Sequence, residues 1–161
     1  LKNGPGNFKG RKLGIYIAEG ADADVVKALK DAATGAGGMV EIVAPHVAGA
    51  KLSDGTTMEA DEKIDGGPSV TYDAVAVVMS EASADRYDKD KPSIDFVNDA
   101  FAHAKFVAYV PAVKPLFESA GVWNWMDEGF FDVSGGKDAA DAFIEKCGEL
   151  RFWARESVKQ D

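Results

Sequence analysis

Few side chains in this sequence could attack or activate a substrate. Cys147 carries the single thiol, and Ser80 places a hydroxyl where a predicted strand ends. Either group would need a neighbouring base to act as the nucleophile of a hydrolase. The two histidines, His46 and His103, are far apart in the sequence, which favours surface or structural roles over a metal site with several converging ligands. One cysteine can form neither an internal disulfide nor a cysteine-based metal site.

The spacing around Cys147 favours packing over reactivity. Phe143, Cys147 and Leu150 fall on one face of a predicted helix, and a free cysteine commonly behaves as a small hydrophobic residue. A reactive thiol is the alternative. Ser80 and its neighbours Glu81 and Ser83 are interpreted as a loop turn, with the alternative that they line a remnant cleft.

Nucleotide binding is disfavoured at the predicted strand ends. In open parallel sheets, ligands bind at the carboxyl ends of the strands, which here are residues 18–20, 79–81 and 110–112. No glycine-rich phosphate loop follows the first strand. Asp22 and Asp24 follow instead, and they suit a helix N-terminus while repelling a phosphate.

Alternating apolar strands and amphipathic helices must position these residues. The pattern predicts a flavodoxin-like three-layer α/β/α sandwich with a central parallel sheet, because continuously apolar strands are typical of sheets covered on both faces. A small hairpin is expected within residues 45–71, around the Asp54-Gly55 turn. The predicted strands are 12–18, 39–44, 73–79, 106–110 and 130–133. The first predicted helix starts at Asp22, and the later helices cover 93–104, 115–120 and 138–155.

Two features near the ends complete this organisation. Residues 1–10, with three glycines and a proline, are predicted to be a linker or arm, and residues 11–161 a single domain. The start at Leu1 suggests a processed or excised piece of a longer chain. The closing helix is expected to face inward through a periodic set of side chains, namely Ala139, Ala142, Phe143, Cys147, Leu150 and Trp153.

Composition excludes several partners. The 161 residues carry a formal net charge of -9, so nucleic acids and anionic membrane surfaces are repelled. The sequence contains no signal peptide and no apolar run long enough to span a bilayer.

Four aromatic residues crowd a short, non-periodic stretch. They pack over the sheet edge, or they form an apolar contact surface for another protein, since aromatic side chains anchor interfaces. The candidates are Trp123, Trp125, Phe130 and Phe131.

The order of segments resembles the class I glutamine amidotransferase-like superfamily, in its branch of small cysteine peptidase-like and stress proteins. The resemblance covers nearly the whole chain from Gly10 and includes LGIYIAEGADADVV, YDAVAVVMSEAS and KFVAYVPAVKP. In that branch the fourth strand ends in a strand–turn–helix elbow that bears a nucleophilic cysteine. The resemblance places Pro111, followed by Ala112, at this elbow, and Pro111 has no nucleophile.

A closer resemblance is to the C-terminal domain of large-subunit haem catalases, carried by RKLGIYIAEGADAD, DFVNDAFAHAKFVAYV, MDEGFFDV and AFIEKCGELRFWARE. It implies a domain without haem of its own, joined by a linker to a haem-containing body. The implied partners are that body and the sister subunits of a tetramer.

Three functions remain open from the sequence. The first is a non-catalytic accessory domain that stabilises the catalase tetramer. The second is an ATP-independent chaperone, because an isolated domain could bind unfolded client proteins through a bare docking surface. The third is a hydrolase-like enzyme with a relocated nucleophile, at Ser80 or Cys147.

Overall fold

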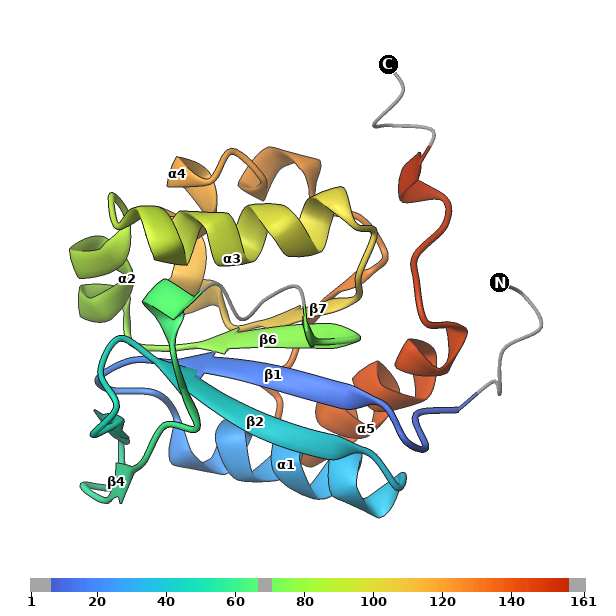
Figure 1. The fold of residues 1–161 in the computed structure, drawn as a ribbon, viewed down its shortest axis with the longest axis horizontal. Helices are drawn as coiled ribbons and strands as arrows, with labels where there is room; N and C mark the ends of the chain where they lie inside the picture. Colours follow the sequence, from blue (N-terminus) through green and yellow to red (C-terminus); the bar gives the residue numbers. More distant parts are fainter. Residues whose placement is uncertain (1–6, 67–70, 157–161) are drawn as a thin grey trace.

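The computed structural model describes residues 7–66 and 71–156 and arranges them in three layers, with a central sheet between two layers of helices (Figure 1). No helix in these ranges is long and apolar enough to cross a membrane. In chain order the principal elements are β1 (Lys12–Ile17), α1 (Ala23–Gly35), β2 (Met39–Ala44), β3 (Ala50–Lys51), β4 (Thr57–Met58), β5 (Glu62–Lys63), β6 (Ala74–Val78), α2 (Glu81–Tyr87), α3 (Lys91–Ala102), β7 (Val107–Tyr109), α4 (Lys114–Ser119), β8 (Phe130–Asp132) and α5 (Lys137–Lys146).

The central sheet confirms the predicted parallel α/β fold. Its strand order is β5-β2-β1-β6-β7-β8, and each pair of neighbours is parallel. The chain passes from β1 outward to β2 and β5, then returns to β6 on the other side. The switch point therefore lies between β1 and β6, and their carboxyl ends are where this fold class places ligands.

Helices cover both faces of the sheet. Helices α1 and α5 pack together on one face, while α2, α3 and α4 cover the other (Figure 1). The start of α1 follows its sequence signal, since the Asp22 carboxylate accepts hydrogen bonds from the backbone N–H groups of Asp24 (2.9 Å) and Val25 (3.1 Å).

The excursion after β2 contains the predicted hairpin and an additional strand. Strands β3 and β4 pair antiparallel, and Gly55 adopts a φ of 88° in the turn. Strand β5 was not predicted from the sequence. It pairs with the end of β2 next to Asp61, whose carboxylate accepts a 2.7 Å hydrogen bond from the N–H of Ile42. A two-residue strand is too short to produce a readable alternation of apolar side chains.

Two predictions of local structure were wrong. Residues 81–87 form a helix rather than a loop turn, and Ser80 caps it by accepting a hydrogen bond from the N–H of Ser83 (3.2 Å). The closing helix is shorter than predicted: α5 ends at Lys146, a single 3-10 turn follows (η5, Cys147–Glu149), and Leu150 has a φ of 71°.

The side chains predicted to face inward are only partly buried. Phe143 and Cys147 are buried as predicted, but Ala142 is exposed on the outer face of α5. Trp153, beyond the end of this helix, keeps 44% of its surface exposed. Helical spacing continues through residue 155, yet the segment after η5 binds residues that lie just ahead of three strands. Tertiary contacts therefore override local propensity here.

Residues 150–156, the C-terminal strap, cross the amino ends of three strands. A side-chain N–H of Arg151 donates to the carbonyl of Asp73, just before β6. The N–H of Phe152 donates to the carbonyl of Ala104, ahead of β7. Arg155 pairs with Asp127, ahead of β8. The strap thus closes the edge of the sheet opposite to the edge where ligands are expected.

The beginning of the folded part lies at the same edge as the strap. Phe8, predicted to lie in the arm, is 1% exposed and packs in the core. A guanidinium N–H of Arg11 donates to the carbonyls of Cys147 (3.0 Å) and Gly148 (3.1 Å), which links the start of β1 to the turn before the strap. Residues 1–6 of the predicted arm lie outside the described residues.

Candidate functional site

The carboxyl edge at the switch point is closed by hydroxyl groups. The carbonyl of Glu19, after β1, accepts hydrogen bonds from the hydroxyls of Ser80 (2.9 Å) and Ser83 (2.7 Å) after β6. The Glu19 carboxylate accepts a hydrogen bond from the N–H of Lys51, on the hairpin. Gly20 has a φ of 83°, and a Cβ atom there would lie 2.6 Å from the Cβ of Ser80. The two strand ends therefore bind each other where a ligand would enter.

The strand–turn–helix elbow after β7 carries no reactive group at its first position. Val110 is extended, and Pro111–Val113 form a 3-10 turn that continues into α4. Pro111 is exposed and Ala112 is partly buried. Proline lacks both a nucleophilic side chain and a backbone N–H, so position 111 can neither attack a carbonyl nor donate a hydrogen bond to an oxyanion.

Cys147 lies far from this elbow, at the amino edge of the sheet. It is 2% exposed, within η5. Burial raises the pKa of its thiol well above the usual value, although the nearby Arg11 cation opposes this rise. A thiol that resists ionisation and contacts little water is a poor nucleophile.

The histidines do not converge. His46 is exposed in the turn after β2, at the carboxyl edge. His103 caps the C-terminus of α3, with its Nδ1 2.7 Å from the carbonyl oxygen of Asp99. Within residues 7–66 and 71–156, no group of three or more His, Cys, Asp or Glu side chains could hold a metal ion.

The aromatic candidates are distributed among different environments. Phe130 and Phe131 are adjacent in β8 and therefore point to opposite faces of the sheet. Phe130 is buried beside Phe117, while Phe131 packs on Phe143 of α5. Neither can join the tryptophans in one surface, since both rings are turned toward the helices.

The two tryptophans differ as well. Trp123 is partly buried, in edge-to-face contact with Tyr109 and below the ammonium of Lys114. Trp125 is 62% exposed and remains available for contact with another molecule.

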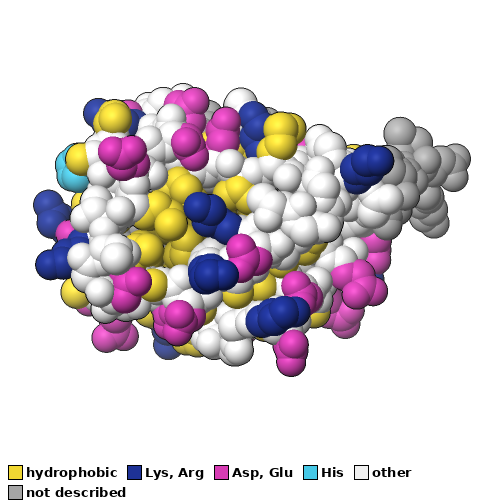
Figure 2. Space-filling view, turned by 90° about the horizontal axis from the view of Figure 1, so that it is seen from below, with side chains coloured by type: hydrophobic (Ala, Val, Ile, Leu, Met, Phe, Trp, Pro, Cys, Tyr) yellow, Lys and Arg dark blue, Asp and Glu magenta, His cyan; other side chains and the backbone are white. Residues whose placement is uncertain are grey.

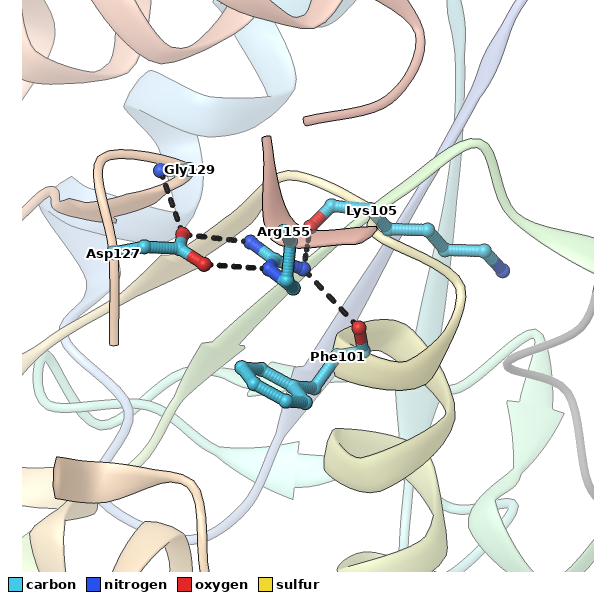
Figure 3. A network of polar contacts seen from close by, with 5 residues as sticks. All are labelled: Phe101, Lys105, Asp127, Gly129 and Arg155. Carbon is cyan, nitrogen blue, oxygen red and sulfur yellow. Dashed lines mark hydrogen bonds and ion pairs between the residues drawn. The ribbon is translucent and has the colours of Figure 1, made fainter. Parts of the chain in front are cut away.

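Sequence reasoning missed a buried ion pair at the amino edge (Figure 3). The Arg155 side chain is 0% exposed, and its Nε and Nη2 donate to the two carboxylate oxygens of Asp127, at 2.6 and 2.9 Å. Its Nη1 donates to the carbonyls of Lys105 (2.8 Å) and Phe101 (3.5 Å). The Gly129 N–H also donates to Asp127.

Aromatic rings enclose this guanidinium. Its central carbon lies 5.0, 4.9 and 5.6 Å from the ring centroids of Phe101, Phe130 and Phe152. A bidentate carboxylate and flat apolar faces are the two environments that suit arginine better than lysine. Phe152 and Trp153 precede Arg155 closely in the sequence, but nothing local identified Asp127, 28 residues away.

A second basic cluster lies beside the strap. Lys105 is buried, close to the Arg151 cation and to the carboxylates of Asp73 and Asp99. Burial, followed by the charge of Arg151, lowers the pKa of the Lys105 ammonium to about 8, although the two carboxylates oppose this shift.

This lowered pKa predicts that stability depends on pH. Between about pH 8 and 10 the unfolded chain binds the Lys105 proton more tightly than the folded chain, so the contribution of Lys105 to stability rises with pH. The slope should be below about 1.4 kcal/mol per pH unit, because residual solvent contact screens the charge. Urea unfolding at pH 7.5 and 9.5 should therefore show that wild type gains stability relative to Lys105→Met.

The comparison with Lys105→Met cancels the opposing contribution of Cys147, whose raised pKa acts in both proteins. The exposed Lys89 provides the matched control as Lys89→Met. If wild type and Lys105→Met change in parallel across this pH range, the lowered pKa is wrong.

Comparison with known proteins identifies related sequences over nearly the whole chain. The family described as the C-terminal domain found in long catalases matches residues 9–157. "Catalase C" of Rhizobium meliloti (strain 1021) is 44% identical over 161 residues, which are 99% of this chain and 23% of the relative. "Catalase HPII" of Pseudomonas putida is 27% identical over 98% of this chain and 22% of that protein. The chain thus spans about a quarter of the length of these relatives.

Solved structures with the same fold belong to the DJ-1/ThiJ/PfpI group. Drosophila melanogaster DJ-1beta superposes with a TM-score of 0.67 at 14% identity, covering 94% of this chain and 96% of that one. Oxidized Toxoplasma gondii DJ-1 gives a TM-score of 0.66 at 19% identity, covering 94% and 95%. At these identities the likeness establishes the fold alone.

Proposed function

Because the chain belongs to the family of C-terminal domains found in long catalases, we propose that it is a non-catalytic accessory domain of a large-subunit catalase. In this proposal the parent protein decomposes hydrogen peroxide at a haem held outside residues 1–161. The domain packs on the haem-containing body and on sister subunits, and it stabilises the assembled tetramer.

The observation that carries this proposal is the proline, Pro111, at the elbow after β7, where the resemblance implies a nucleophile. Ser80 and Ser83 offer no substitute, since both hydroxyls donate to the Glu19 carbonyl and Ser80 also caps α2. A relocated site at Cys147 is disfavoured by the burial of its thiol. These contacts argue against the hydrolase alternative at both of its candidate positions.

The hollows beside α1 also fit a haem poorly. Two hollows of about 380 and 320 Å³ flank α1. Figure 2, a view of the molecule from below, shows apolar side chains among charged ones on this side. Neither hollow is lined by His, Cys or Tyr, which commonly ligate haem iron, and charged side chains surround both. His46 and His103 lie at opposite edges of the sheet. We therefore place the haem of the parent protein outside this domain.

Truncation of the full-length parent protein tests the accessory role. A protein that ends before residue 7 should keep its haem and its peroxide turnover per haem at low temperature, while its tetramer dissociates at a lower temperature. Sedimentation and turnover, measured after heating, separate these effects. An equally stable truncated tetramer would refute stabilisation, and peroxide decomposition by residues 1–161 alone would refute the non-catalytic assignment.

We also propose ATP-independent chaperone activity for the isolated domain. The exposed indoles of Trp125 and Trp153 offer apolar contacts to an unfolded chain, and the net charge of -9 keeps the complex dispersed. Light scattering of a heat-unfolded client should fall without ATP. Equal protection by the same mass of an inert acidic protein would reduce the effect to one of solubility and refute this activity.

A further inference from the structure

We propose that the amino edge of the sheet is the surface that docks on the preceding, haem-containing part of the same polypeptide, with Trp125, Trp153 and Met39 as its apolar anchors. This inference rests on the proposed accessory function and assigns its contact surface. Three of the four large exposed apolar side chains in the described residues belong to this group, with exposed fractions of 62%, 44% and 52%. The fourth, Val47, follows the carboxyl end of β2.

The buried ion pair joins the two segments that carry these tryptophans. Trp125 lies two residues before Asp127, and Trp153 lies two residues before Arg155, so the bidentate contact joins the segments that carry them. Gly129 reinforces this junction, because a Cβ atom there would lie 3.0 Å from the Cβ of Phe152. Met39 begins β2 at the same edge, where its N–H donates to the Arg11 carbonyl.

The part of the strap that carries Trp153 is held firmly although residues 150–154 are not helical. The backbone N–H of Phe152 donates a hydrogen bond to the carbonyl of Ala104, and its ring packs edge-to-face on Phe106. Arg155 is buried in its ion pair with Asp127. An aromatic anchor on a fixed segment loses little conformational freedom when it binds, which favours affinity. Tryptophan is among the residue types enriched at the energetic centres of interfaces.

The occupant follows from where the chain enters the domain. Phe8 and Arg11 lie at the amino edge, next to η5 and the strap. The relatives are about four times as long as this chain, and the matching family is a C-terminal one, so the remainder of such a protein connects at this edge. Attachment at this edge gives the body a high effective concentration beside the exposed indoles.

The test uses the full-length parent protein and a protease that cleaves the connection ahead of residue 7. The double variant Trp125→Ala/Trp153→Ala should release the domain about 10-fold faster or more, as expected for the loss of interface anchors. Met39→Gln, an independent change at the same edge, should also speed release. Val47→Ala, at the opposite edge, is the matched control and should release at the wild-type rate.

Two further measurements keep the outcomes distinguishable. Circular dichroism melting of residues 1–161 with each substitution identifies any variant that is unfolded rather than undocked. If truncation destabilises the tetramer but the double variant releases the domain at the wild-type rate, the docking edge is wrong while the accessory function stands. Faster release in Val47→Ala alone would assign docking to the carboxyl edge and also overturn the inference. If truncation leaves the stability of the tetramer unchanged, the proposed accessory function is refuted, whatever the release rates of the variants are.

Discussion

Replacing Arg155 by alanine is expected to lower the free energy of unfolding by about 3–5 kcal/mol, the largest single-residue effect we predict for this chain. The substitution removes a bidentate contact with Asp127, two bonds to carbonyl groups and the packing of three phenylalanine rings around the guanidinium. It also leaves the carboxylate of Asp127 partly buried without its cation. Equilibrium urea unfolding of residues 1–161, followed by circular dichroism, measures the change.

The matched control is a solvent-exposed ion pair. Lys91→Ala breaks the contact with Asp95 on α3, where both side chains remain largely in water, so the unfolding midpoint should stay nearly unchanged. Asp127→Asn should destabilise strongly as well, because it leaves a buried guanidinium without a carboxylate. A loss below about 1 kcal/mol in Arg155→Ala would show that the strap contributes little to folding.

Gly20→Ala is expected to cost about 2–4 kcal/mol, because two penalties coincide at this residue. Its φ of 83° disfavours any residue with a Cβ atom by about 1–2 kcal/mol. The added methyl group would lie 2.6 Å from the Cβ and 2.9 Å from the hydroxyl oxygen of Ser80, and overpacking of this kind costs about 1–3 kcal/mol. To relieve this clash, the ends of β1 and β6, which now close the carboxyl edge, would have to move apart.

Gly55→Ala separates the two penalties. Gly55 has a φ of 88° in the hairpin turn, and nothing lies within 4 Å of an added Cβ atom. Its destabilisation should therefore reflect backbone conformation alone. Thermal unfolding of both variants tests the difference, and equal losses would show that the contact between Gly20 and Ser80 does not hold the edge closed.

Elements whose signals lie within a few neighbouring residues could be predicted from the sequence. The parallel sheet followed from continuously apolar runs, and the hairpin from Asp54-Gly55. The start of α1 followed from Asp22, whose carboxylate bonds two and three residues ahead. Pro111 could also be placed directly after the fourth core strand, because a short apolar run ends at the residue before it.

Other features depend on partners that are distant in the sequence. Phe130 packs against α4 and Phe131 packs against α5, on opposite faces of β8. The sequence could not predict whether these two rings are buried by helices or form a contact surface. Ser80 could be assigned to a strand end, but the carbonyl that its hydroxyl binds belongs to Glu19, 61 residues away. The spacing of residues along the chain does not predict contacts between residues that are far apart in the sequence.

The sequence by itself determined the fold class, the order of the core strands along the chain and the family, because apolar periodicity, turn residues and recognisable segments are local properties. Only the tertiary structure decided that the chain leaves the helix after Lys146 and crosses the sheet as a strap. The physical reason is that Arg155 gains a carboxylate, two carbonyls and three rings only when Asp127, Lys105 and Phe101 are already assembled around it. Helical spacing continues to residue 155, but the free energy of these long-range contacts outweighs it.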